Sequence, residues 1–185
     1  MSLRTKSYLA FYDMDGTILC ENSATHMVRE LRSRGLMNSV QVQRALLSSL
    51  LYKLGLGNPA GMVKRMLTWT EGFEAEMIQQ LGREIYEARI SKLFRHAVLN
   101  SIAKHRAQNA GIVVLSSALC PICRPVAEEL SADALICSAL GQRNGQLTGT
   151  LEGKLVFGPE KQVQMQNFCE ENEQHASQAW YYGDS

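Results

Sequence analysis

The sequence predicts an α/β fold, in which helices cover a parallel β-sheet and an all-helical segment interrupts the chain after the first strand. Short apolar runs that end in polar residues, typical of buried parallel strands, stand at 8–12, 112–115 and 179–182. Between the first two runs, residues 24–95 show only helical periodicity. We therefore expect a sheet core built from residues 1–20 and 97–185, and a helical cap built from residues 21–96.

The composition is that of an ordinary globular protein. Of the 185 residues, 45% are hydrophobic and 20% are charged, and the formal net charge is +1. This balance predicts no nucleic-acid partner and no attraction to an acidic membrane. No apolar run approaches the roughly 18 residues that a membrane span needs, and residues 1–7 lack the apolar core of a secretory signal. We expect a cytoplasmic protein.

The chain has an odd number of cysteines, and they are scattered, at positions 20, 120, 123, 137 and 169. Such a set is more typical of reduced thiols in the cytosol than of a disulfide framework. Cys120 and Cys123 form a single C-x-x-C motif, with no second pair and no nearby histidine. We interpret them as buried thiols rather than zinc ligands, and a redox role is the alternative.

The first predicted strand ends at two carboxylates, because Asp13 and Asp15 follow the run at 8–12. Side chains alternate along a strand, so these acids point the same way at its carboxyl end, where ligands bind in open α/β sheets. Like charges this close repel each other, and a metal cation would offset the repulsion. A solvated Asp-x-Asp-Gly turn is the alternative. A calcium loop is disfavoured, because it would place Phe11 and Asn22 at ligand positions.

The helical segment begins with two clear patterns. Ser23 is a suitable N-cap for a helix over 24–34, which Gly35 would end. A second helix fits 39–54. Its apolar stripe consists of Val42, Ala45, Leu46, Leu50 and Leu54.

Two further helices complete the segment. Pro59 suits the first turn of a third helix, whose apolar face, with Met62 and Met66, we interpret as core. A fourth and longer helix fits 73–95. The sequence Gly55-x-Gly57-x-x-Ala60 follows a helical pattern, so we interpret it as a helix connection and not as a dinucleotide fingerprint.

The second half of the chain alternates helices and strands. Helices are predicted over 97–109, 121–131 and 159–171. Strands are predicted over 112–115, 134–138 and 179–182. Asn144-Gly145 predicts the turn of a hairpin within 141–151.

Three polar residues of this half stand where a phosphate site needs them. Ser117 follows a predicted strand and precedes a helix start, where a hydroxyl and backbone N–H groups bind a phosphate oxygen. Lys161 lies in the first turn of a helix, where a cation opposes the helix dipole, so its position indicates a function. Asp184 ends the last predicted strand as Asp13 ends the first, and would supply a third ligand oxygen. Taken singly, each of the three is more simply an ordinary turn or surface residue.

Together and in this order, these residues resemble the four motifs of the haloacid dehalogenase-like hydrolase superfamily. The matching residues are Asp13-x-Asp15-Gly16-Thr17, Ser117, Lys161 and Gly183-Asp184. The helical insert after the first motif, the segment Val113 to Ala118 and the hairpin before Gly158-Pro159-Glu160-Lys161 are similar to the phosphoserine-phosphatase-like branch. The resemblance spans nearly the whole chain. It implies a Rossmann-like parallel sheet core with an all-helical cap domain inserted after the first strand.

The resemblance also implies a Mg²⁺-dependent phosphatase that acts on a small phosphorylated metabolite. Asp13 would be the nucleophile that forms an aspartyl-phosphate, and Asp15 would protonate the departing alcohol and then accept a proton from water. The metal ligands would be the Asp13 carboxylate, the Asp15 main-chain carbonyl and Asp184. The phosphate oxygens would be held by Ser117, Lys161 and Thr17.

Some features depart from the branch or leave alternatives. Dehalogenases of the superfamily lack the second acid, so Asp15 favours a phosphate monoester. The branch carries a further acid four residues after its last motif, and then a strand and a helix. We therefore expect either that the chain, which stops at Ser185, is truncated or that its site is incomplete. Asn22 stands where phosphoserine-specific enzymes carry a glutamate, so phosphoserine is not predicted as the specific substrate. The alternatives are a phosphotransferase or mutase, a non-catalytic phosphate-ligand binding module, or one part of a longer bifunctional protein.

Overall fold

The structure, a computed structural model, describes residues 3–54, 56, 61 and 65–183. Among these residues, four parallel strands form one sheet in the order β3-β2-β1-β6. The strands are β1 (Leu9–Tyr12), β2 (Gly111–Leu119), β3 (Ala134–Ser138) and β6 (Trp180–Tyr182). This arrangement confirms the predicted α/β class with a parallel sheet.

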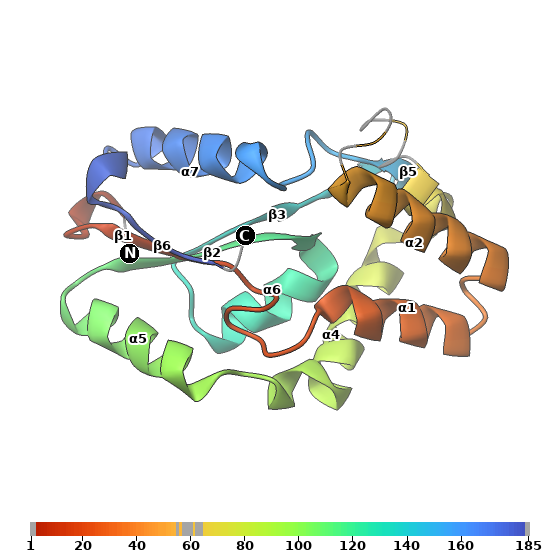
Figure 1. The fold of residues 1–185 in the computed structure, drawn as a ribbon, viewed down its shortest axis with the longest axis horizontal. Helices are drawn as coiled ribbons and strands as arrows, with labels where there is room; N and C mark the ends of the chain where they lie inside the picture. The colour runs from red at the N-terminus through yellow and green to blue at the C-terminus, as the bar shows by residue number, and fades with distance from the viewer. Residues whose placement is uncertain (1–2, 55, 57–60, 62–64, 184–185) are drawn as a thin grey trace.

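Helices cover both faces of the sheet (Figure 1). α7 (Pro159–Glu171) lies on one face, and α5 (His96–Ala107) and α6 (Cys120–Glu129) lie on the other. Alternate residues of β1 point to opposite faces of the sheet. Phe11 packs in one core cluster with Phe168 of α7, and Tyr12 packs in the other core cluster. All four residues of β1 are buried, which is why the strand reads as an unbroken apolar run.

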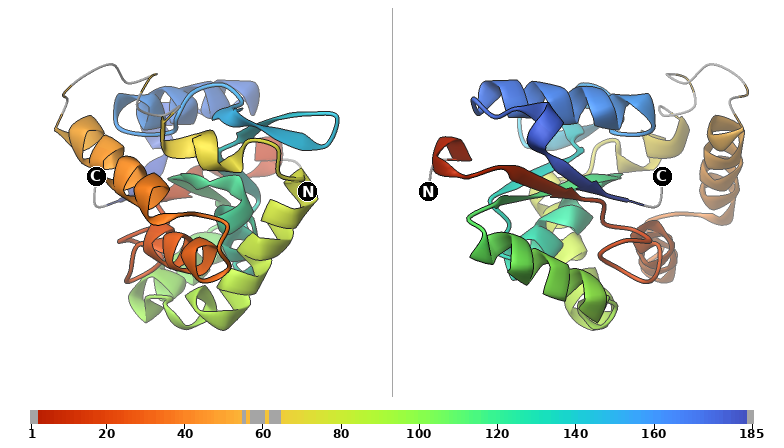
Figure 2. Two further views of the ribbon diagram at one scale, coloured as in Figure 1. Left: turned by 90° about the vertical axis from the view of Figure 1, so that its right-hand side faces the viewer. Right: turned by 60° about the vertical axis from the view of Figure 1, so that its left-hand side comes forward.

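The segment between β1 and α5 contains α1 (Ser23–Ser33), α2 (Ser39–Lys53) and α4 (Ala75–Ala88), with short 3₁₀ turns at Thr68–Thr70 and Ile90–Lys92. As predicted, the described part of this segment contains no strand, only isolated bridges. The first two helices lie beyond the carboxyl ends of the strands (Figure 2). α4 packs closely against α6: a Cβ on Gly82 would stand 2.1 Å from the Pro121 carbonyl oxygen, so only glycine fits.

Two of the predicted helix boundaries are wrong. Asn22, and not Ser23, caps α1, because its side chain accepts a hydrogen bond from the Ala24 N–H at 3.0 Å. The predicted helix over 73–95 ends at Ala88, and a 3₁₀ turn follows. The apolar pattern continues across that break because Ile90 is fully buried within the turn. The residues Pro59, Met62, Gly55, Gly57 and Ala60, on which other expectations rested, lie outside the described residues.

The helix predicted over 39–54 is present as α2, but only part of its apolar stripe is buried. Val42 is buried, but the side chains of Leu46, Leu50 and Leu54 are more than half exposed. Apolar residues surround most of this helix, so their spacing could not select the side that packs. None of the described helices has the length and hydropathy needed to cross a lipid bilayer.

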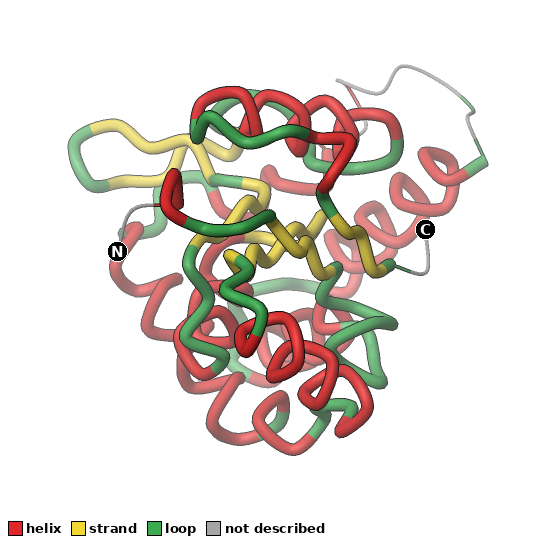
Figure 3. Tube along the Cα trace, turned by 90° about the vertical axis from the view of Figure 1, so that its left-hand side faces the viewer, coloured by secondary structure: helices red, strands yellow, loops and turns green. Residues whose placement is uncertain are grey.

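A hairpin of β4 (Leu140–Arg143) and β5 (Gln146–Leu151) projects from the body of the molecule (Figure 3). Its turn residues Asn144 and Gly145 both have positive φ angles, of 52° and 81°, as the predicted tight turn requires. The Ala75 N–H donates to the Gly145 carbonyl at 2.8 Å, which ties the hairpin to the start of α4.

The expectation that all five cysteines are reduced is wrong. Cys120, the first residue of α6, forms a disulfide with Cys137 of β3, whereas Cys123 is a buried free thiol. The interpretation of Cys123 as a buried thiol is confirmed, whereas Cys120 of the same C-x-x-C motif is bonded to Cys137. Burial raises the pKa of the Cys123 thiol, so we expect Cys123 to be unreactive.

We expect Cys120→Ser to lower the free energy of unfolding by about 3 kcal/mol, because the disulfide closes a loop with a sequence separation of 17. Thermal unfolding without reductant measures this, with Cys20→Ser, an exposed free thiol, as the matched control. Reductant should bring the wild-type melting temperature down to that of the variant. A wild-type protein that melts identically with and without reductant would contradict the bond.

Candidate active site

Asp13 and Lys161 form a buried ion pair at the carboxyl end of β1. Their side chains are 5% and 7% exposed, and the Lys161 Nζ donates to the Asp13 Oδ2 although 148 residues separate them. The Met14 N–H donates to the other carboxylate oxygen at 2.8 Å. The Asp13 N–H itself donates to the Tyr182 carbonyl of β6 at 2.8 Å. Backbone contacts with Met14 and with β6 therefore position Asp13, whose carboxylate the sequence predicts to be the nucleophile.

Asp15 is held by Ser23, the first residue of α1. The Ser23 N–H donates to Oδ1 at 2.8 Å, and its hydroxyl donates to Oδ2 at 3.0 Å. Burial raises the pKa of Asp15, the two Ser23 hydrogen bonds oppose this, and the nearby Asp13 charge adds to the rise. A raised pKa suits a carboxyl group that must carry a proton before giving it away. Sequence reasoning missed this role for Ser23, which it interpreted as a helix cap.

The residues after Asp15 form a tight turn that keeps both acids at the strand end. Gly16 has φ of 78°, a conformation that favours glycine. The chain then folds back, so that the Ile18 N–H donates to the Asp13 carbonyl at 3.2 Å. Thr17 lies in this turn and is half-buried. The motif Asp-x-Asp-Gly-Thr is therefore also a local folding unit.

Ser117 lies near the end of β2, which is longer than predicted and leads directly into α6. The β1–β2 register pairs Tyr12 with Val114, which places Ser116 and Ser117 beside the residues that follow β1. Ser117 is half-buried, and its carbonyl accepts a hydrogen bond from the Ser138 hydroxyl at 3.0 Å. Ser116, which sequence reasoning passed over, is buried and accepts from the Ala118 N–H at 3.2 Å.

Asp184, the third predicted metal ligand, lies outside the described residues. Among those that the structure describes, no three His, Cys, Asp or Glu side chains gather as a metal-ligand group. The oxygens present, the Asp13 carboxylate and the Asp15 main-chain carbonyl, are the hard donors that Mg²⁺ prefers, and Mg²⁺ usually keeps several waters. The donor chemistry therefore fits Mg²⁺.

An aromatic network behind the site connects α5 with β1 and β6. The His105 Nδ1 shares a hydrogen bond with the Tyr8 hydroxyl, and its Nε2 with the Tyr182 hydroxyl, both at 2.8 Å. Tyr12 and Tyr182 stack with ring centroids 4.7 Å apart. Burial lowers the pKa of His105 and raises that of Tyr12 to about 12, so we expect both side chains to be neutral near pH 7. The network therefore holds Tyr182 in place, and the Tyr182 carbonyl accepts the hydrogen bond from the Asp13 N–H.

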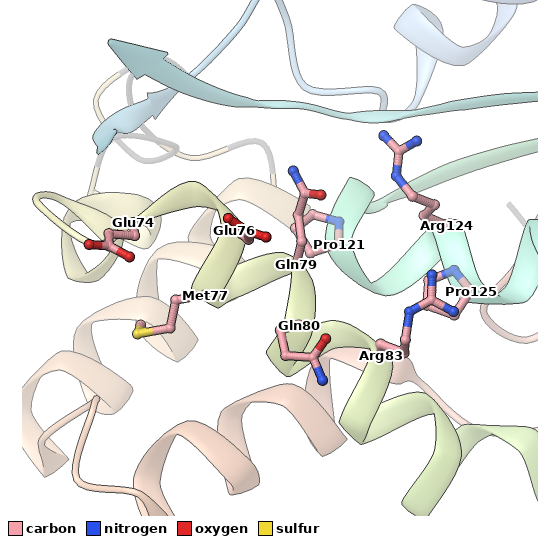
Figure 4. A pocket seen from close by; sticks show the side chains of 9 residues that line it. All are labelled: Glu74, Glu76, Met77, Gln79, Gln80, Arg83, Pro121, Arg124 and Pro125. Carbon is pink, nitrogen blue, oxygen red and sulfur yellow. The ribbon is translucent and has the colours of Figure 1, made fainter. Parts of the chain in front are cut away.

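A separate hollow of about 440 Å³ lies between α4 and α6 (Figure 4). Its lining mixes acidic Glu74 and Glu76 with basic Arg83 and Arg124, and it includes none of the predicted site residues that the structure describes. Arg83 is already paired with Glu128 at 2.9 Å. The mixed charges of this lining show no preference for an anion.

A family model and several solved structures match this chain, and they agree on its family and its fold. The family model of haloacid dehalogenase-like hydrolases matches residues 10–185. A protein of unknown function from Bordetella pertussis Tohama I superposes with a TM-score of 0.82 at 18% identity, over 96% of this chain and 82% of that one. A phosphoserine phosphatase, solved as a phospho-aspartyl intermediate analogue, gives 0.68 at 16% identity, over 98% and 79% of the two chains.

A curated relative is the inhibition of morphological differentiation protein of Streptomyces azureus. It is 21% identical over 181 residues, which cover 95% of this chain. The chain spans about 65% of the length of that relative.

Proposed function

Since this chain belongs to the haloacid dehalogenase-like hydrolase family, we propose that it is a Mg²⁺-dependent phosphatase, which hydrolyses a small phosphomonoester through an aspartyl-phosphate at Asp13. The observation that carries the proposal is the buried Asp13–Lys161 pair beside Asp15.

The proposed location is the cytoplasm. The proposed cap is residues 21–96 and the core is residues 1–20 and 97–185. The position of α1 and α2 beyond the strand ends supports this division.

In the first step, a carboxylate oxygen of Asp13 attacks phosphorus while the bond to the alcohol oxygen breaks. A carboxylate is ionised at neutral pH, so it needs no base, and its obstacle is repulsion by the phosphate anion. Lys161 offsets part of that repulsion, and Ser117 and Thr17 hold phosphate oxygens. When bound by the Asp13 carboxylate, the Asp15 carbonyl and Asp184, Mg²⁺ supplies further charge neutralisation.

Asp15 handles the proton in both steps. Protonated Asp15 gives its proton to the departing alkoxide oxygen. In the second step, a water attacks the aspartyl-phosphate and passes its proton to Asp15, which releases phosphate and restores the Asp13 carboxylate. The two hydrogen bonds from Ser23 keep Asp15 oriented for both transfers.

The role of Asp15 is tested with Asp15→Asn. We expect kcat for an alkyl phosphate to fall by about 10²- to 10⁴-fold, because the poor leaving group needs a proton. For p-nitrophenyl phosphate, whose leaving group is stable without one, the loss should be at least tenfold smaller. Steady-state kinetics on both substrates measure this, with Glu30→Gln on α1 as the control. Equal losses on the two substrates would remove Asp15 from proton transfer.

A further inference from the structure

A cavity of about 170 Å³ opens beside the carboxylate site, between α1, the Thr68–Thr70 turn and the start of α6. Two serines, Ser23 and Ser117, are among its lining residues. Most of its wall is apolar, and none of the lining residues that the structure describes carries a charge. The larger apolar contributors are Met27, Leu31, Met37, Leu67, Trp69 and Ile122.

The two serines connect this cavity to the chemistry. Ser23 holds Asp15 by two hydrogen bonds, and Ser117 is the residue proposed to hold a phosphate oxygen. The cavity lining therefore includes the residue that orients Asp15 and the proposed phosphate ligand, together with apolar residues of the helical segment and the start of α6. In a phosphomonoester whose phosphate sits at Asp13, the organic group is the part that can enter the cavity.

We infer that the substrate carries an uncharged, apolar group next to its phosphate, and that this cavity accommodates it. The inference rests on the proposed function and specifies its substrate class. An ammonium or carboxylate group placed here would lose its water without gaining a partner of opposite charge, which is strongly unfavourable. By size, a cavity of about 150 Å³ takes a benzene-sized group, so we expect a group on the order of six carbons.

A series of linear alkyl phosphates tests the inference. Each methylene buried should raise kcat/KM by about fourfold, so hexyl phosphate should exceed ethyl phosphate on the order of 10²-fold. The kcat/KM for O-phosphoserine should be lower than that for hexyl phosphate by a similar factor. The inference would be overturned if kcat/KM were equal for ethyl and hexyl phosphate, or if it were highest for phosphoserine. Either result would leave the proposed phosphatase function standing.

A variant that fills the cavity makes the test specific. Ala45 lines the cavity from α2, so Ala45→Phe should lower the hexyl-to-ethyl ratio of kcat/KM at least tenfold. Gln43→Phe, at an exposed position of the same helix outside the lining, is the control and should keep the wild-type ratio. An unchanged ratio in Ala45→Phe would place the alkyl group elsewhere.

Binding of non-hydrolysable phosphonates separates this inference from the proposed function. Trp69 lines the cavity, and the protein has two tryptophans, so fluorescence in a Trp180→Phe background reports on the cavity. Hexylphosphonate should change the Trp69 emission and bind at least tenfold more tightly than methylphosphonate. Failure to hydrolyse any phosphate would overturn the proposed function, whereas equal binding of the two phosphonates would overturn the inference.

Discussion

Replacing Asp13 with asparagine is expected to reduce phosphatase turnover by about 10⁵-fold, the scale on which loss of a covalent nucleophile acts. The amide has nearly the same shape, and it can keep the hydrogen bond from the Met14 N–H. It lacks the negative charge that attacks phosphorus. The loss should therefore appear in kcat for every phosphomonoester, whatever its leaving group.

The measurement combines steady-state turnover with detection of the covalent phosphoryl group. Rapid acid quench followed by mass spectrometry should find an adduct on Asp13 in the wild type and none in Asp13→Asn. Glu152→Gln, at an exposed acid in the segment after β5, is the control and should turn over normally. Full turnover by Asp13→Asn, with the asparagine verified intact by mass, would refute the proposed mechanism.

Replacing Lys161 with methionine is expected to lower the free energy of unfolding by about 3–5 kcal/mol, because it leaves a buried carboxylate without its cation. The corresponding drop in melting temperature is on the order of 10 °C for a protein of this size. Chelator must be present, so that a metal ion does not replace the lost charge. Activity should fall as well, since Lys161 is proposed to neutralise the phosphate.

A double-mutant cycle distinguishes the pair from a general packing effect. Asp13→Asn combined with Lys161→Met removes both charges, so the double variant should be more stable than the sum of the two single losses predicts. Lys154→Met is the matched control: Lys154 pairs with Glu160 at 3.2 Å but is largely exposed, and its loss should change stability by less than about 1 kcal/mol. Additive losses at Asp13 and Lys161 would mean that the pair does not form in solution.

Local patterns were sufficient to predict most elements. Pro159 in a first helical turn and the periodicity after it gave a helix whose bounds agree with those of α7. Asn144-Gly145 gave the hairpin, because both positions need positive φ. The predicted end of a helix was wrong where the apolar pattern continued beyond the helix, as it does from α4 into the Ile90–Lys92 turn.

The sequence by itself determined the sheet core, the helical segment after β1 and the strand-end position of Asp13 and Asp15, because short-range periodicity and turn chemistry encode them. Only the tertiary structure brought Lys161 onto Asp13, set Ser23 against Asp15, paired Cys120 with Cys137 and selected the packed side of α2. Most of these contacts join residues far apart in the chain. Their energy depends on burial and on the neighbouring element, which spacing within one segment does not specify.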